Sequence, residues 1–243
     1  MLRAFATFDE VLTVGELALL VDVHKSTASR LAGTLAANEL LRRGSDGEGY
    51  RLGPEVVRLG QVAGVPLALA TAAEPVLHDL VLQTGETAVL SVASGSDGVD
   101  VLVARSPHAV CMTTRTGNRT PLHACCNGKV FLAFGAGRYP DVLERRTPAT
   151  ITTAAELEAA VGEVRRLGWA AAIGEWEEGL NGVAAPVYGA SGACVAAVSV
   201  GGPAFRVSTA GLEEFAAECR RAAGVLSARL GADASSRFKE ASA

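Results

Sequence analysis

Residues 120–129, Thr-Pro-Leu-His-Ala-Cys-Cys-Asn-Gly-Lys, bring together the side chains that are best suited to chemistry. The segment is typical of a loop that runs into a helix, and unpaired N–H groups at a helix start around Cys126–Lys129 attract an anion. A carboxylate ligand would fit there. Cys125 or Cys126 could instead act as a nucleophile with His123 as its base, which would make the chain a hydrolase.

The spacing of these residues disfavours the hydrolase. Residues two or three positions apart meet only if the loop folds back, and no orienting acid is found nearby. His123 is more typical of a packed, hydrogen-bonded histidine, and adjacent cysteines usually pack as small, soft side chains. Two neighbouring thiols could also oxidise, so redox sensing by Cys125 and Cys126 is a further alternative.

A second group of residues is suited to contact with nucleic acid. Short hydrogen-bonding groups and cations gather at the start of a predicted helix, the part of a recognition helix that meets base edges in a major groove: Lys25, Ser26, Thr27, Ser29 and Arg30. Three more cations, Arg42, Arg43 and Arg51, lie on a predicted hairpin, where they would contact phosphates. The expected partner is double-stranded DNA.

Two short helices and a hairpin must position these residues. Thr13 and Glu16 have the capping-box spacing that begins a helix, and the apolar residues that follow repeat at helical intervals. After a turn around residues 22–24, the second helix has a predicted buried face made of Ala28, Leu31, Ala32 and Leu35. The hairpin follows over residues 40–52. These elements predict a winged helix-turn-helix over residues 1–53.

Composition sets limits on the rest. The 243 residues suit one small and one medium domain, and the net charge of −4 indicates that any DNA contact is local. Five cysteines without a CxxC pair favour a reducing cytoplasm and argue against a structural metal. No signal peptide or membrane-spanning run is evident. We expect a cytoplasmic protein without cofactor, metal or membrane partner.

The segments after the hairpin predict an α+β domain. Pro54 begins a linker helix within residues 54–66. Helices are expected over 68–83, 129–134, 154–167 and 209–230, and strands over 87–93, 99–104, 183–188 and 195–200. Hairpins mixed with helices are typical of an α+β fold. This domain is expected over 67–232, followed by a disordered tail over 233–243.

Over residues 2–207 the chain resembles the IclR family of bacterial transcription regulators. The resemblance rests on ordered motifs: His24-Lys25-Ser26-Thr27, Tyr50-Arg51-Leu52-Gly53, Thr84-Gly85-Glu86-Thr87, Pro121-Leu122-His123-Ala124, Gly128-Lys129, Gly168-Trp169-Ala170, Glu175 and Ala184-Ala185-Pro186-Val187. It implies a winged helix-turn-helix followed by a GAF-like antiparallel-sheet domain that binds a small effector. It also implies homodimers, often paired into homotetramers, on operator DNA.

The resemblance places the effector pocket in the loop that carries His123, Cys125, Cys126 and Asn127. Its walls would come from Met112, Thr120, Ala172, Gly182 and Ser199. Many relatives carry acidic residues where this chain has Ala171, Ala172 and Ile173, so this wall is expected to be apolar. The expected function is therefore a ligand-responsive repressor that senses a carboxylate with an apolar or aromatic body. A redox-sensing regulator and a hydrolase are the alternatives.

Overall fold

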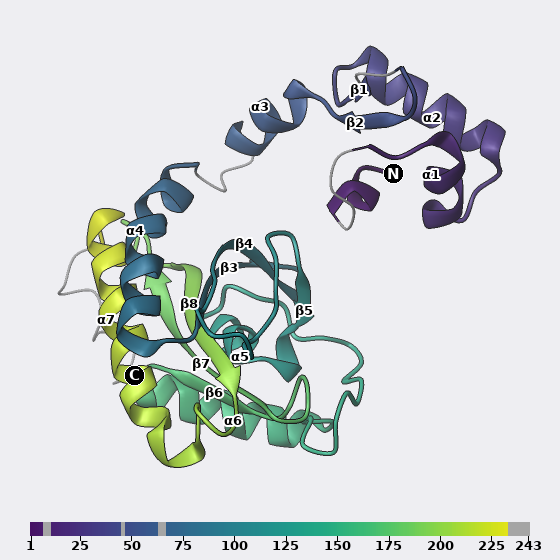
Figure 1. The fold of residues 1–243 in the computed structure, drawn as a ribbon. Coiled ribbons are helices and arrows are strands. Elements are labelled where there is room, and N and C mark those ends of the chain that lie inside the picture. The colour runs from purple at the N-terminus through teal and green to yellow at the C-terminus, as the bar shows by residue number, and fades with distance from the viewer. Residues whose placement is uncertain (7–10, 45–46, 63–66, 233–243) are drawn as a thin grey trace. The chain divides into compact units, whose positions relative to one another are not determined.

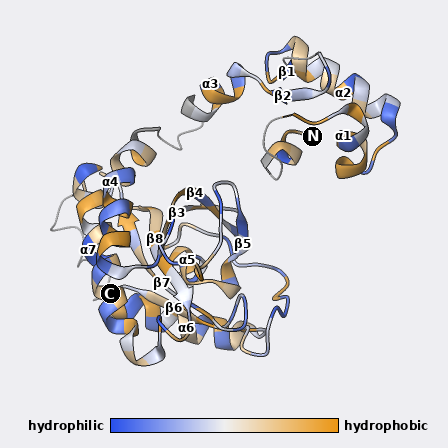
Figure 2. Ribbon diagram, viewed as in Figure 1, coloured by the Kyte–Doolittle hydropathy of each residue, from blue (hydrophilic) through white to orange (hydrophobic). Residues whose placement is uncertain are grey.

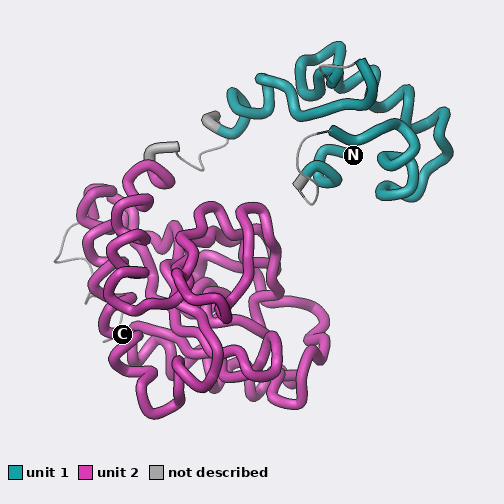
Figure 3. Tube along the Cα trace, viewed as in Figure 1, with its two compact units in different colours: residues 1–68 teal, residues 69–243 magenta. Residues whose placement is uncertain are grey.

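The computed structural model describes residues 1–6, 11–44, 47–62 and 67–232 (Figure 1). The chain divides into two compact units, residues 1–68 and 69–243 (Figure 3). This division falls beside residue 67, where the effector domain is expected to begin. The expected tail over 233–243 and the end of the expected linker, 63–66, lie outside the described residues.

The first unit contains the two predicted helices and the predicted hairpin. Its elements are the 3₁₀ helix η1 (Leu2–Ala6), α1 (Val14–Val21), α2 (Lys25–Ala37), β1 (Leu41–Arg43), β2 (Tyr50–Leu52) and α3 (Pro54–Val62). The capping box at the start of α1 is confirmed, because Thr13 Oγ1 accepts a bond from the Glu16 N–H and Glu16 accepts one from the Thr13 N–H. Asp22, in the left-handed conformation, ends α1 and turns the chain toward α2.

A small core holds this unit together. Phe5, Leu12, Leu17, Ala32, Leu41 and Tyr50 are its buried members. Leu12 also pairs with Tyr50 through two backbone hydrogen bonds, which attach the segment before α1 to the hairpin. The prediction for the buried face of α2 is correct for Ala28 and Ala32 but wrong for Leu31, which is 43% exposed. Leu31 lies at the edge of the helical stripe, beyond the reach of this small core.

The second unit is built on a six-stranded antiparallel sheet in the order β5-β4-β3-β8-β7-β6. Its strands are β3 (Thr87–Ser94), β4 (Asp97–Ala104), β5 (Arg119–Pro121), β6 (Ala170–Ile173), β7 (Leu180–Tyr188) and β8 (Cys194–Pro203). The four long strands are those that the sequence predicts. The edge strands β5 and β6 are not predicted, because three or four residues are too few to show alternation. The α+β class is confirmed.

Helices cover both faces of this sheet (Figure 1). The long helices α4 (Leu67–Thr84) and α7 (Leu212–Arg229) bury one face, and α5 (Cys126–Ala133) and α6 (Ala154–Leu167) pack on the other. Side chains alternate accordingly along β7, where Val183 and Ala185 face the first core and Ala184 faces the second. Apolar residues recur along α4 and α7 in Figure 2. Two short 3₁₀ helices, η2 (Leu122–Ala124) and η3 (Thr209–Gly211), precede α5 and α7.

Helix α5 begins at Cys126, three residues before the helix start that periodicity predicts. Its first turn carries Cys126, Asn127 and Gly128, which have no helical apolar pattern. Among the described residues, no helix is long and apolar enough to cross a membrane.

Candidate functional site

The start of α2 presents a polar surface. Lys25, Ser26, Thr27, Ser29 and Arg30 are all exposed, whereas Ala28 between them is fully buried. His24 caps the helix, since its Nδ1 accepts a hydrogen bond from the Ser26 N–H at 3.3 Å and lies 2.8 Å from Ser26 Oγ. The sequence places His24 only in a turn. Its capping role orients the first turn of α2, where the predicted base contacts lie.

The hairpin separates its three arginines. Arg42 and Arg51 are directly paired across β1 and β2, so their side chains lie on the same face. Arg43 instead lies over the Tyr50 ring at 4.6 Å. Neither Arg42 nor Arg51 forms an ion pair with another described residue, and Arg51 Nε is buried without a partner among them. Two facing cations repel each other, and a bound phosphate would remove that cost.

The second unit contains a partly open cavity of about 380 Å³ beside the start of α5. Eight of the predicted effector residues line it: Met112, Thr120, Cys125, Cys126, Asn127, Ala172, Gly182 and Ser199. His123 does not. It lines a smaller hollow with Asp97 and Glu144, and its Nε2 lies 3.0 Å from the Glu144 carbonyl oxygen. The structure thus brings together the predicted walls and separates His123 from them.

The first turn of α5 forms one end of this cavity. Cys125 caps the helix, because its sulfur accepts a bond from the Gly128 N–H at 3.3 Å. The N–H groups of Cys126 and Asn127 precede the first intrahelical bond and carry the positive end of the helix dipole. Gly128 packs directly on η2, since a Cβ there would lie 2.1 Å from the Leu122 carbonyl oxygen. A glycine is therefore required where the two helices meet.

A buried hydrogen-bond chain runs from β4 to α5. Asp100 accepts bonds from Thr114 Oγ1 at 2.7 Å and from Ser91 Oγ at 2.8 Å, and Ser91 Oγ accepts one from Asn127 Nδ2 at 2.7 Å. Burial raises the pKa of Asp100, and hydrogen bonds from the Thr114, Ser91 and Asn118 side chains oppose that rise. Asn127 Oδ1 is left buried without a partner among the described residues. The chain ties a carboxylate in the cavity wall to the start of α5.

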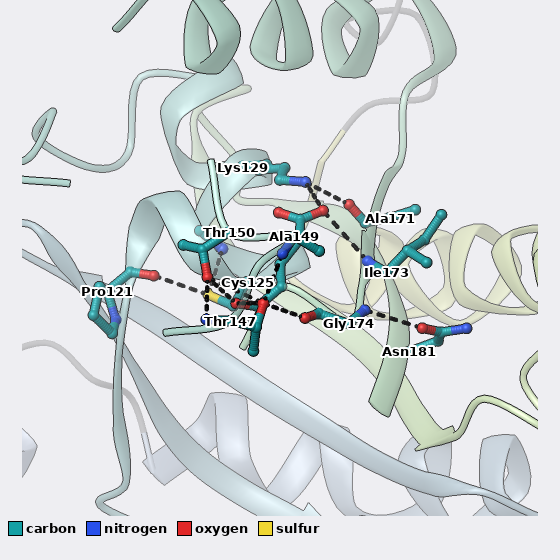
Figure 4. A network of polar contacts seen from close by, with 12 residues as sticks. Pro121, Cys125, Lys129, Thr147, Ala149, Thr150, Ala171, Ile173, Gly174 and Asn181 are labelled. Carbon is teal, nitrogen blue, oxygen red and sulfur yellow. Dashed lines mark hydrogen bonds and ion pairs between the residues drawn. The ribbon is translucent and has the colours of Figure 1, made fainter. Parts of the chain in front are cut away.

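A second network joins α5 to the turn between β6 and β7 (Figure 4). Lys129 Nζ lies 2.6 Å from Glu175 Oε1 and donates to the Ala171 carbonyl at 2.8 Å. Thr147 and Thr150 donate hydroxyl bonds to the backbone carbonyls of residues 174 and 175, respectively. The residues that follow, from Trp176 to Gly179, line the cavity. The network therefore holds one cavity wall against another.

The geometry gives Cys125 and Cys126 no general base among the described residues. His123 Nε2 contacts a backbone carbonyl, and the Cys125 thiol lies 3.4 Å from both Thr120 Oγ1 and the Pro121 carbonyl oxygen. Burial raises the pKa of both the Cys125 and the Cys126 thiols, which disfavours the reactive thiolate. This arrangement does not favour the hydrolase alternative.

Sequence reasoning missed part of the cavity. Asp100, Thr114, Asn118, Trp176, Asn181 and Gly201 also line it. Only Asp100 left a signal in the sequence, because it is an acidic residue at a buried position of an alternating strand. Thr114, Asn118 and Trp176 lie in loops. Asn181 and Gly201 lie on β7 and β8, where strand pairing decides which residues they meet.

Two family models match the two parts of the chain separately. Residues 64–228 match the family model described as bacterial transcriptional regulator IclR C-terminal, and residues 1–45 match the IclR helix-turn-helix domain. The HTH-type transcriptional regulator XynR of Escherichia coli is 30% identical over 226 residues, which cover 90% of each chain.

Solved structures of IclR proteins also resemble this chain over most of its length. A putative IclR transcriptional regulator from Silicibacter is 27% identical, with a TM-score of 0.78 over 96% of this chain and 95% of that one. An IclR homologue from Microbacterium hydrocarbonoxydans, crystallised with 4-hydroxybenzoate, is 26% identical, with a TM-score of 0.77 over 94% of this chain and 96% of that one.

Proposed function

Because this chain belongs to the IclR family of ligand-responsive bacterial transcriptional regulators, we propose that it is a cytoplasmic repressor controlled by a small organic acid. Helix α2 and the hairpin would bind operator DNA, and the cavity beside α5 would bind the acid. The observation that carries the second part is that the first turn of α5, the positive end of the helix dipole, lines the cavity.

The DNA-binding part of the proposal is supported by exposure and charge. Lys25 and Arg30 stand with three hydroxyl side chains on the exposed first turns of α2, as in a recognition helix that enters a major groove. Arg42 and Arg51 share one face of the hairpin and would contact phosphates.

The chemistry of the lining supports an acid with an apolar or aromatic body. A carboxylate at the start of α5 would accept bonds from the Cys126 and Asn127 N–H groups. Met112, Ala172 and Val89 offer apolar contact to the remainder of the molecule. The relative from Microbacterium hydrocarbonoxydans binds 4-hydroxybenzoate, a molecule of this kind.

Control of DNA binding would be a shift between two arrangements of a homodimer, or of a homotetramer built from two dimers. A two-fold dimer presents two recognition helices to two half-sites. An acid that binds one arrangement more tightly than the other changes the population, and with it the operator affinity. Helix α3 is the segment that would carry this preference between the units.

The test is a gel shift of the full chain on the DNA upstream of its own gene, repeated across a panel of organic acids. We expect a specific complex whose affinity changes with at least one acid. Arg30→Ala should weaken it by about 5- to 150-fold, the worth of one good base contact, whereas Arg166→Ala, an exposed arginine on α6, should not. If the chain failed to bind this DNA under every condition, the proposal that it is a DNA-binding regulator would be contradicted.

A further inference from the structure

All charged side chains among the described residues that line the cavity are acidic. Asp100 is buried in its wall, and two exposed acids of the β6–β7 turn, Glu177 and Glu178, also line it. The described lining residues include no lysine, arginine or histidine. An anion entering this cavity therefore meets carboxylates and finds no cationic side chain among the described lining residues.

The neighbouring cation is committed elsewhere. Lys129 lies in the first turn of α5, but its Nζ is held by Glu175. It also donates to the Ala171 carbonyl, as Figure 4 shows. The remaining attraction for an anion is the start of α5, equivalent to roughly half an elementary charge. That is enough to hold one carboxylate, and the described lining residues supply no cation to neutralise a second.

Asp100 also makes the inner part of the cavity rich in acceptors. It takes the hydroxyl protons of Ser91 and Thr114, so Ser91 Oγ can only accept from Asn127 Nδ2. Asn127 Oδ1 is consequently left as a buried acceptor without a partner among the described residues. A carboxylate has about four acceptor positions. The Ser91, Thr114 and Asn118 side chains occupy three of those of Asp100, which leaves one for a further donor.

We infer that Asp100 is a specificity-determining residue: it selects a monocarboxylate that carries a hydrogen-bond donor, such as a hydroxyl, and excludes dicarboxylates. This inference rests on the proposed effector site. The hydroxyl of such an acid would donate to the acceptors around Asp100. A second carboxylate would instead face Asp100, Glu177 and Glu178, with no cationic side chain among the described lining residues.

The test compares acids of matched skeleton on the full chain by calorimetric titration. The aromatic set is benzoate, 4-hydroxybenzoate and terephthalate, and the aliphatic set is butyrate, 4-hydroxybutyrate and succinate. In at least one set we expect the hydroxy acid to bind the wild type best and the diacid at least tenfold more weakly. Asp100→Asn should shrink that ratio several-fold, because it removes the charge and keeps the shape.

Asp97→Asn is the matched control, since Asp97 lies on the same strand but pairs with Arg119 at 3.0 Å outside this cavity. Its ratio should equal that of the wild type. The exposed double variant Glu177→Gln/Glu178→Gln should also reduce the ratio, and it tests the charge argument if Asp100→Asn does not fold. A diacid that binds the wild type as tightly as the hydroxy acid would overturn the inference, as would a ratio unchanged in folded Asp100→Asn. Binding of none of the six acids to the wild type would contradict the proposed effector site itself.

Discussion

Among single residues, Lys129 and Glu175 form the most deeply buried cation–anion pair of the described chain. Their side chains are 6% and 11% exposed, and they join α5 to the turn that carries Trp176. Glu175 Oε2 has no hydrogen-bond partner among the described residues, and Oε1 accepts a longer bond from the Ile173 N–H at 3.3 Å, so Lys129 is the main stabilising contact of the carboxylate. A complete buried ion pair adds little to the free energy of unfolding. Removing only one partner is costly, because the other charge stays buried and unpaired.

We therefore expect Lys129→Met to lower the free energy of unfolding by about 3–5 kcal/mol, because it leaves a buried carboxylate unpaired. The double variant Lys129→Met/Glu175→Gln should recover much of that loss. Denaturant unfolding at pH 7 measures both. Arg166→Ala serves as the control, since its pair with Glu163 is 67% and 52% exposed and should contribute at most about 1 kcal/mol. Additive losses in the double variant would contradict this account.

At the scale of elements, the cavity depends on how closely α5 packs against η2. The contact is backbone against backbone, and Gly128 is the residue that permits it. Local propensity opposes a glycine at this point in a helix, so tertiary packing decides the position of the helix start. The same packing places the first turn of α5 at the cavity wall.

Gly128→Ala should destabilise the second unit by about 1–3 kcal/mol or more, since a Cβ would overlap the backbone of Leu122. Gly162→Ala on α6 is the matched control, because a Cβ there meets nothing within 4 Å. It should stabilise the helix by about 0.5–1 kcal/mol. Thermal and denaturant unfolding would measure both changes. Equal effects of the two substitutions would refute the packing argument.

At the scale of the whole molecule, the described contacts divide into two units with separate cores. The candidate DNA surface lies entirely in one and the cavity entirely in the other. Ligand binding stabilises only the unit that it touches, by about 2.7 kcal/mol at a hundredfold excess over Kd.

Scanning calorimetry of the full chain should consequently show two transitions. The tightest-binding acid of the panel should raise the midpoint of the transition of residues 69–243, and operator DNA should raise that of the first unit. The two transitions are assigned by Gly162→Ala, which changes only the second unit. A single transition that both ligands shift equally would show that the units unfold together.

Much of the local structure could be predicted from the sequence. The capping box of α1, the helical spacing of α1 and α6, and the alternation of the four long strands depend on residues a few positions apart. The exposed polar residues of α2 follow from the same periodicity, because a residue outside the apolar stripe faces solvent. The residues themselves indicated the helix start at Cys126 and Asn127 as a binding site. Five further wall residues came instead from the resemblance to a family: Met112, Thr120, Ala172, Gly182 and Ser199.

Tertiary structure alone decided the chemistry of the cavity. Lys129 and Glu175 are 46 positions apart, and Asp100 meets Asn127 only through Ser91 on a neighbouring strand. The same holds for His123, which the fold turns toward Glu144, and for Leu31, which the small core of the first unit leaves exposed. Periodicity determines which face of an element is buried, but the neighbour that it meets there is set by the pairing of strands and the packing of helices far apart in the chain.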